Sequence, residues 1–201
     1  MRYPAEQKQQ TSAKILRAAG RLFRKQGYAA TGVDAVMASA NLTAGGFYFH
    51  FQSKEDLLAA TLDNIFREGT KDRPEHLSKL RGHAWLRAFG GYYLSQQHRD
   101  SPDHGCPMPA LATEIARVGG KPRVVFEQHL ERVIESVAEQ FDAESPDRQS
   151  AITMLAQCLG GIMLARAVGD SKLSDEILRA CRASTTKEIE TTSLAETTSQ
   201  R

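Results

Sequence analysis

The chain has 201 residues, of which 41% are hydrophobic and 25% charged, and its formal net charge at pH 7 is +2. This length holds one large or two small domains and is enough to bury a core. There is no run of about eighteen apolar residues and no apolar leader, so we expect a soluble, cytoplasmic protein that does not span a membrane. The three cysteines are widely spaced and form no C-x-x-C pair, which predicts neither a disulfide framework nor a structural zinc site.

Positive charge is concentrated in the N-terminal part of the chain. Residues 1–54 carry eight Lys or Arg and two acidic residues, whereas the remainder carries 18 basic and 22 acidic residues. Binding to phosphate requires a basic surface of this kind. The charge count alone also fits an ordinary solvated helix face.

The first predicted helix spans residues 11–26 and follows a polar arm over residues 1–10. Apolar residues recur at the i, i+3, i+4, i+7 spacing of an amphipathic helix. Gly27 supplies the stop signal. We expect Leu22 and Phe23 to pack in the core against the region of Val36 and Phe47.

Residues 31–54, TGVDAVMASANLTAGGFYFHFQSK, predict two short helices joined by a tight turn. Thr31 is the expected N-cap of the first helix, and Asn41 stands where the chain must leave it in a left-handed conformation. Thr43 would cap the second helix, which runs to His50. Two short helices joined in this way form a helix-turn-helix, whose second helix enters the major groove of DNA.

The paired glycines and aromatics of GGFYFHF, the SK that follows and the apolar helix DLLAATL resemble the DNA-binding motif of the TetR family of bacterial transcriptional repressors. Together with the preceding helix, the resemblance covers roughly residues 11–66. It departs from the common family pattern at Ala44, where a basic residue is frequent, and at Phe49. The resemblance implies an all-α fold with an N-terminal three-helix DNA-binding domain and a larger helical C-terminal domain for ligand binding and dimerisation.

The resemblance also implies roles for single residues of the motif. Thr43, Tyr48 and Lys54 would meet the phosphate backbone. Gly45 and Gly46 would let the helix approach the base edges, although simple fit between helices is the alternative. The full expected DNA-contacting set is Thr31, Thr43, Ala44, Gly45, Gly46, Tyr48, His50 and Lys54, in which His50 has a solvated or capping role as its alternative.

Beyond the motif, every predicted element is a helix. Ser53 should cap a helix over residues 53–67 that connects the DNA-binding domain to the rest, and a polar segment over 68–82 follows. Further amphipathic helices are predicted over residues 83–97, 107–118, 121–141, 151–168 and 174–182. We expect a DNA-binding domain over 1–52, an effector-binding and dimerisation domain over 53–184, and a disordered, Thr-, Ser- and Glu-rich tail over 185–201.

Aromatic and sulfur side chains in the C-terminal half are candidates for an effector pocket. Taken singly, each fits an ordinary core better than a pocket, and the family resemblance is what implies a cavity for a drug-sized or lipid-like ligand. The candidate set is Trp85, Phe89, Tyr92, Tyr93, Cys106, Met108, Phe126 and Met154.

Cys106 lies between a polar turn and the helix that should begin at Pro107. Exposed amides at a helix start stabilise a thiolate, so Cys106 is a candidate for reaction with electrophiles or oxidants. An unreactive loop cysteine is the alternative. His104 and Cys106 have no further ligands at metal-binding spacing, and we expect no metal and no cofactor.

Small residues recur along the predicted helix over residues 151–168 and would let another helix approach closely. In the resembling family, two C-terminal helices of each subunit form a four-helix dimer interface. An internal core use fits the same residues nearly as well. The candidate interface set is Ala156, Gly160, Met163, Ala167 and Leu178.

The sequence therefore predicts a ligand-responsive, homodimeric repressor that binds a palindromic operator in double-stranded DNA and answers to a small-molecule or thiol-reactive effector. The alternatives are a helical enzyme that uses Cys106 as its nucleophile and a helical protein-binding module without DNA binding. No catalytic acid or base accompanies Cys106 other than His104, so we do not expect an enzyme.

Overall fold

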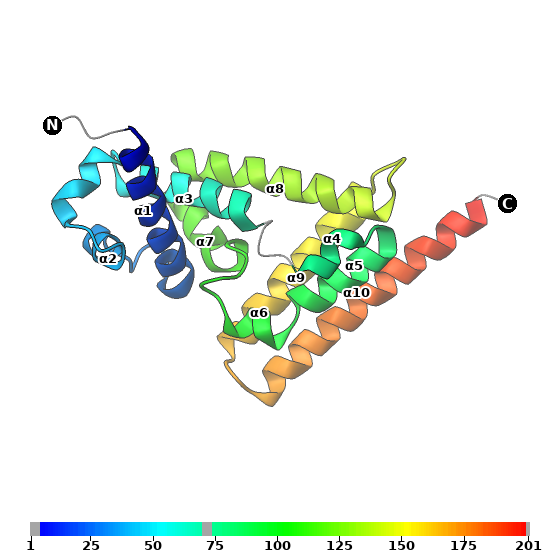
Figure 1. The fold of residues 1–201 in the computed structure, drawn as a ribbon. Coiled ribbons are helices and arrows are strands. Elements are labelled where there is room, and N and C mark those ends of the chain that lie inside the picture. Colours follow the sequence, from blue (N-terminus) through cyan, green and yellow to red (C-terminus); the bar gives the residue numbers. More distant parts are fainter. Residues whose placement is uncertain (1–4, 70–73, 200–201) are drawn as a thin grey trace. The chain divides into compact units, whose positions relative to one another are not determined.

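The structure is a computed structural model that describes the backbone of residues 5–69 and 74–199 and the side chains of residues 6–69 and 74–186. Within these ranges all regular elements are helices, which confirms the predicted all-α fold. In chain order (Figure 1) the elements are α1 (Ala5–Gln26), α2 (Val33–Ser39), the 3-10 helix η1 (Ala44–Phe49), α3 (Lys54–Gly69), α4 (Glu75–Lys79), α5 (Gly82–Tyr93), α6 (Gln96–Asp100), α7 (Met108–Val118), α8 (Gly120–Phe141), α9 (Arg148–Ala167) and α10 (Lys172–Ser199).

The chain forms two compact units, which we describe separately. The first unit comprises residues 1–71 and 102–129, and the second comprises residues 72–101 and 130–201. The division differs from the predicted functional domains, because α3, α7 and the first half of α8 belong to the same compact unit as the helix-turn-helix. Helix α8 is continuous from one unit into the other.

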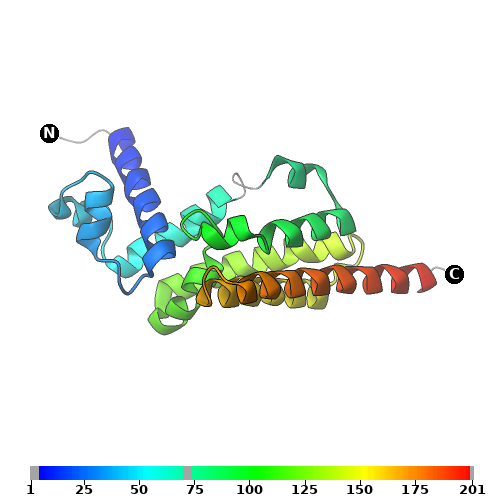
Figure 2. The same cartoon turned by 90° about the horizontal axis from the view of Figure 1, so that it is seen from below.

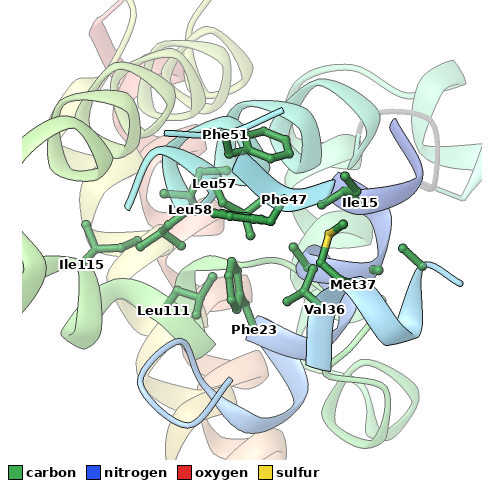
Figure 3. Packing of buried hydrophobic residues seen from close by; sticks show 14 residues of the cluster. Ile15, Phe23, Val36, Met37, Phe47, Phe51, Leu57, Leu58, Leu111 and Ile115 are labelled. Atoms are coloured by element: carbon green, nitrogen blue, oxygen red, sulfur yellow. The ribbon is translucent and has the colours of Figure 1, made fainter. Parts of the chain in front are cut away.

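The core of the first unit joins α1, α2, η1, α3 and α7 (Figure 3). Phe23 of α1, Val36 of α2 and Phe47 of η1 are fully buried in it, as their spacing predicted. Leu111 and Ile115 of α7 fill the same core although they lie far along the chain. The helix-turn-helix is therefore packed on side chains from well outside residues 1–52.

Two residues with positive φ end the first helices of this unit. Gly27 has φ +88° and ends α1, its amide donating to the carbonyl of Phe23. Asn41 has φ +58° and leads the chain out of α2, while Leu42 donates back to the carbonyl of Met37. Both stop signals predicted from the sequence are confirmed, because they rest on conformations that few other residue types adopt.

Two local predictions in this unit were wrong. Helix α1 begins at Ala5 rather than at residue 11, since Glu, Gln and Lys are good helix formers even without an apolar stripe. Gly32, not Thr31, is the N-cap of α2. The predicted second motif helix is present over Ala44–Phe49, with Thr43 at the N-cap position but without a side-chain hydrogen bond. It is a 3-10 helix, because the two glycines at its start do not favour an α-helical turn.

In the second unit, α9 lies along α10, with α5 and α6 against the same pair (Figure 2). The closest approach is at Gly161, where a Cβ atom would lie 2.9 Å from Cys181 Sγ and 2.9 Å from Leu94 Cδ2. Gly161 is thus required by sterics, whereas Gly160 has no atom within 4 Å of the position its Cβ would take. Cys158 is buried in this core.

A buried guanidinium fixes the start of α10 in the second unit. The side chain of Arg99 is 5% exposed and pairs with Asp100, Asp170 and Asp175 at 2.6, 3.2 and 3.2 Å. Arg99 also donates to Ser174 Oγ at 2.9 Å. A buried charge needs partners of this kind, since an unpaired one is costly.

Helix α10 continues to Ser199, so most of the predicted disordered tail over 185–201 is helical; residues 200 and 201 lie outside the described range. No glycine or proline interrupts residues 172–199, and Thr185 is buried against α5 next to Gly90. A Thr-, Ser- and Glu-rich composition does not reveal that packing.

Helix α9 is long and apolar enough to cross a membrane by length and composition, with mean hydropathy 1.3 over its most apolar window. It is the only such helix within the described ranges. The same properties belong to the core helix of a soluble protein, and α9 packs on α10, α5 and α6.

Candidate nucleic-acid interface

Helix η1 turns one side chain into the core and exposes the others. Phe47 is fully buried, whereas Tyr48 is 76% and Phe49 58% exposed. Thr43, Ala44 and Gly45 are exposed beside them. Aromatic side chains as exposed as these contribute little to the core. Next to glycines whose backbone is accessible, they are typical of an interaction surface.

The start of α1 reaches the same place. The ammonium group of Lys8 lies over the ring of Phe49, 4.7 Å from its centroid. Burial lowers the pKa of His50, and the positive charge of Lys8 lowers it further. The imidazole of His50 is therefore held towards its neutral form beside an exposed cation.

Lys54 is positioned by the loop between α1 and α2. Its ammonium group lies 4.2 Å from the ring centroid of Tyr28 and 3.5 Å from the carbonyl oxygen of Ala29. Burial lowers the pKa of Lys54, while the charge of Glu114 opposes that shift. Ser53 caps α3 by accepting from the amide of Asp56 at 3.0 Å, which confirms the predicted cap.

Glu114 of α7 holds this loop and was not singled out by the sequence. Its carboxylate accepts hydrogen bonds from the amides of Tyr28 and Ala29 at 2.7 and 2.8 Å. A Cβ atom at Gly27 would lie 3.2 Å from the same carboxylate. No local pattern points to Glu114, because its partners lie 86 and 85 residues away.

Thr31 lies inside the unit rather than on the exposed surface. Its side chain is fully buried, and its hydroxyl donates to the carbonyl of Gly27 at 2.6 Å and accepts from Gln26 at 3.2 Å. A hydroxyl that bonds back by four residues is satisfied within the chain. We therefore leave Thr31 out of the proposed interface.

The predicted effector residues fall into both compact units. Cys106, Met108 and Phe126 belong to the first unit. In the second, Trp85 stacks on Phe89 at 4.8 Å. The rest of the set, also in the second unit, is Tyr92, Tyr93 and Met154, of which Tyr93 and Met154 are buried and Tyr92 is half-buried.

Cys106 is half-buried and forms no disulfide, and it precedes Pro107, which is the N-cap of α7 rather than its first helical residue. The backbone beside it is tied to α1, because Arg24 donates to the carbonyl of Gly105 at 3.1 Å. The neighbouring His104 is exposed and lies 3.5 Å from Asp103.

One side of the α9–α10 pair is apolar and uncovered within the chain. Ile152, Met163, Leu164 and Val168 of α9 are exposed, and Leu173 of α10 is exposed as well. Three of the predicted interface residues, Ala156, Gly160 and Ala167, share the uncovered part of α9. Leu178 was predicted wrongly as an interface residue, because it is buried within its own unit.

Residues 15–61 match the family model described as "Bacterial regulatory proteins, tetR family". An uncharacterized HTH-type transcriptional regulator of Lactococcus lactis subsp. lactis is 26% identical over 172 residues, which cover 80% of this chain and 85% of that protein. The HTH-type transcriptional regulator TtgR of Pseudomonas putida is 38% identical over 65 residues, which cover 32% of this chain and 31% of TtgR.

Solved structures match across most of the chain. The reduced form of NemR from E. coli has a TM-score of 0.72 at 20% identity and covers 88% of this chain and 96% of its own. A TetR-family regulator from Cytophaga hutchinsonii has a TM-score of 0.76 at 18% identity and covers 94% of this chain and 97% of its own. At these identities the match establishes the fold.

Proposed function

We propose that this chain, a transcriptional regulator of the TetR family with a helix-turn-helix DNA-binding domain, is a cytoplasmic homodimeric repressor of a palindromic operator. A small-molecule or thiol-reactive effector would release it from the DNA. The observation that carries the proposal is the exposed face of η1, whose glycines and aromatics stand next to the basic α1. The relatives compared are all regulators, and the chain is not an enzyme.

The exposed side chains of η1 suit a duplex. The hydroxyl groups of Thr43 and Tyr48 can donate to phosphate oxygens, and the exposed Gly45 lets the backbone approach the base edges. Ala44 offers a methyl contact to thymine. Lys54 adds a positive charge one turn beyond this surface, held in place by Tyr28.

The uncovered apolar side of α9 and α10 supports the homodimer. Large apolar side chains such as Leu164 and Met163 are exposed on a helix that otherwise belongs to a core. A second copy of the chain could cover them with the same surface, as two-fold symmetry requires. Such a dimer would present two helix-turn-helix motifs to two half-sites.

Two contacts in the first unit would carry an effector signal to the DNA-binding motif. Glu114 joins α7 to the loop before α2. Asp63 of α3 bonds His129 of α8 at 3.0 Å, and His129 stacks on Phe66 at 4.6 Å. An effector needs only about 1.4 kcal/mol of differential affinity for two states of these contacts to change operator affinity tenfold.

The function is tested by selecting duplexes from a random library with the purified protein and footprinting the products. We expect a palindromic site, and Tyr48→Ala should weaken binding to it at every salt concentration tested. Recovery of no duplex by a folded protein would refute the repressor and favour a helical protein-binding module.

The dimer is tested separately by sedimentation. Met163→Glu places a charge on the uncovered side of α9 and should yield monomers, whereas Lys172→Ala at the start of α10 should not. A dimer that survives Met163→Glu unchanged would place the interface elsewhere.

The effector class is tested by comparing operator release by an electrophile in the wild type and in Cys106→Ser. The release should be lost in Cys106→Ser if the effector is thiol-reactive.

A further inference from the structure

The contact between Lys8 and Phe49 joins the start of α1 to the exposed end of η1. The ammonium group lies 4.7 Å from the ring centroid, and 41 residues separate the two in sequence. Both side chains are exposed, so the contact buries little apolar area. The expected DNA-contacting set includes neither residue.

A cation over an aromatic face is attracted by about 0.5–1 kcal/mol at exposed sites. That attraction offsets part of the roughly 2 kcal/mol of rotamer entropy that a lysine side chain loses when it is held in one place. The ammonium has three N–H donors, and the ring face uses only part of that capacity. The remaining donors can bind an anion beside η1.

The two side chains of this region that are shown to interact with Lys8, those of Phe49 and His50, carry no negative charge. His50, next to Phe49, has its pKa lowered by burial and by the charge of Lys8, so it is held towards the neutral imidazole. Neither Phe49 nor neutral His50 offsets the ammonium. A phosphate group is the partner that a positioned cation next to a DNA-reading helix would take.

We propose that Lys8 is a further DNA-contacting residue whose ammonium binds a backbone phosphate beside η1, and that Phe49 is the positioning residue that holds it there. The proposal rests on the proposed function, since it requires operator binding. Phe49 would thus contribute to DNA binding by positioning Lys8, although its own side chain has neither a hydroxyl group nor a charge.

If Phe49 positions Lys8, an uncharged residue influences the salt dependence of operator binding. Each phosphate neutralised on duplex DNA contributes about 0.9 to the slope of log affinity against log salt. A dimer with two Lys8 contacts should lose about 1.8 from that slope when Lys8 is replaced by Ala. Phe49→Leu keeps apolar bulk but has no ring, so it should lose a similar amount.

The experiment measures fluorescence anisotropy of a duplex selected by the wild type, over a series of salt concentrations. The variants are Lys8→Ala, Phe49→Leu, Phe49→Tyr and the Lys8→Ala/Phe49→Leu pair, with Lys172→Ala in the second unit as the charge control. Thermal unfolding of each variant checks that it is folded, which the exposure of both side chains favours.

We expect Lys8→Ala, Phe49→Leu and the pair to share one reduced slope, while Phe49→Tyr and Lys172→Ala keep the slope of the wild type. An unchanged slope in Lys8→Ala overturns the contact, and an unchanged slope in Phe49→Leu overturns the positioning role. An equal reduction in Lys172→Ala also overturns the proposal, because net charge alone would explain it. Failure of the wild type to select any duplex would refute the proposed function as well.

Discussion

Replacing Glu114 by Ala tests whether α7 holds the loop that begins the DNA-binding motif. The substitution removes a carboxylate that accepts from the amides of Tyr28 and Ala29 at 2.7 and 2.8 Å. Hydrogen bonds to charged groups contribute about 1.5–3 kcal/mol each. Water can replace part of this contribution, because Tyr28 is only partly buried and Ala29 is exposed.

We therefore expect Glu114→Ala to lower the free energy of unfolding by about 1–3 kcal/mol, which is less than the roughly 3–6 kcal/mol of two such bonds because water replaces part of them. With a urea slope of about 2 kcal/mol per molar, the midpoint should fall by roughly 1 M. Glu114→Gln keeps one acceptor oxygen and should lose about half as much. In both variants the amides of Tyr28 and Ala29 should exchange with solvent faster.

The assay is urea unfolding at a fixed protein concentration, combined with hydrogen exchange resolved to residues 27–33. Glu127→Ala removes an exposed carboxylate from α8 and serves as the control, with an expected change within about 0.5 kcal/mol. If Glu114→Ala also stays within that range and the two amides keep their exchange rates, the loop does not depend on α7.

Three further changes test other parts of the structure. Gly161→Ala should cost about 1–3 kcal/mol in urea unfolding, since its methyl group would lie 2.9 Å from a sulfur and a carbon atom, whereas Gly91→Ala enters open space and should not destabilise. Burial lowers the pKa of His98, so its protonation favours the unfolded chain; stability should fall as pH drops below about 6.5, and less so in His98→Asn. A pH dependence unchanged in His98→Asn, with His76→Asn as the exposed control, would exclude that origin. Gly27→Ala should cost about 1–2 kcal/mol by differential scanning calorimetry because its φ is +88°, and an unaltered melting temperature would refute the strain.

Local rules predicted the parts of the fold that depend on nearest neighbours along the chain. Gly27 and Asn41 stand at positive φ because few other residues adopt it, and the spacing of apolar residues identified Phe23, Val36 and Phe47 as core. Each of these inferences needs only a residue and its periodicity.

The failures have a common physical origin in contacts that sequence spacing does not encode. Thr31 was expected to cap α2, but the carbonyl of Gly27 is a better partner once α1 ends where it does. Glu114 can hold the loop after α1 only because α7 packs beside α1 in the folded chain. The tail was expected to be disordered, and the burial of Thr185 beside Gly90 shows what composition omits.

The sequence pattern bears more directly on the surface of η1 than on the effector site, and the roles of both residue sets stay predictions. Tyr48 and Thr43 are exposed as a DNA contact requires, since the direction of a side chain on a short helix follows from its buried neighbour Phe47. The aromatic residues proposed for a pocket follow helical spacing as well. That spacing does not say to which compact unit a residue such as Phe126 or Trp85 belongs.

The hold of Glu114 on residues 28 and 29 bears on the construction of hybrid regulators. A graft that joins residues 1–52 of this chain to a foreign sensor would separate the two amides from the carboxylate that they bond. In the transplanted segment, the loop before α2 would then be held less firmly when the helix-turn-helix binds its operator, unless the recipient supplied a carboxylate at the position of Glu114. Residues 1–52 should therefore be transferred together with α7, so that the transferred domain keeps the hydrogen bonds that Glu114 accepts.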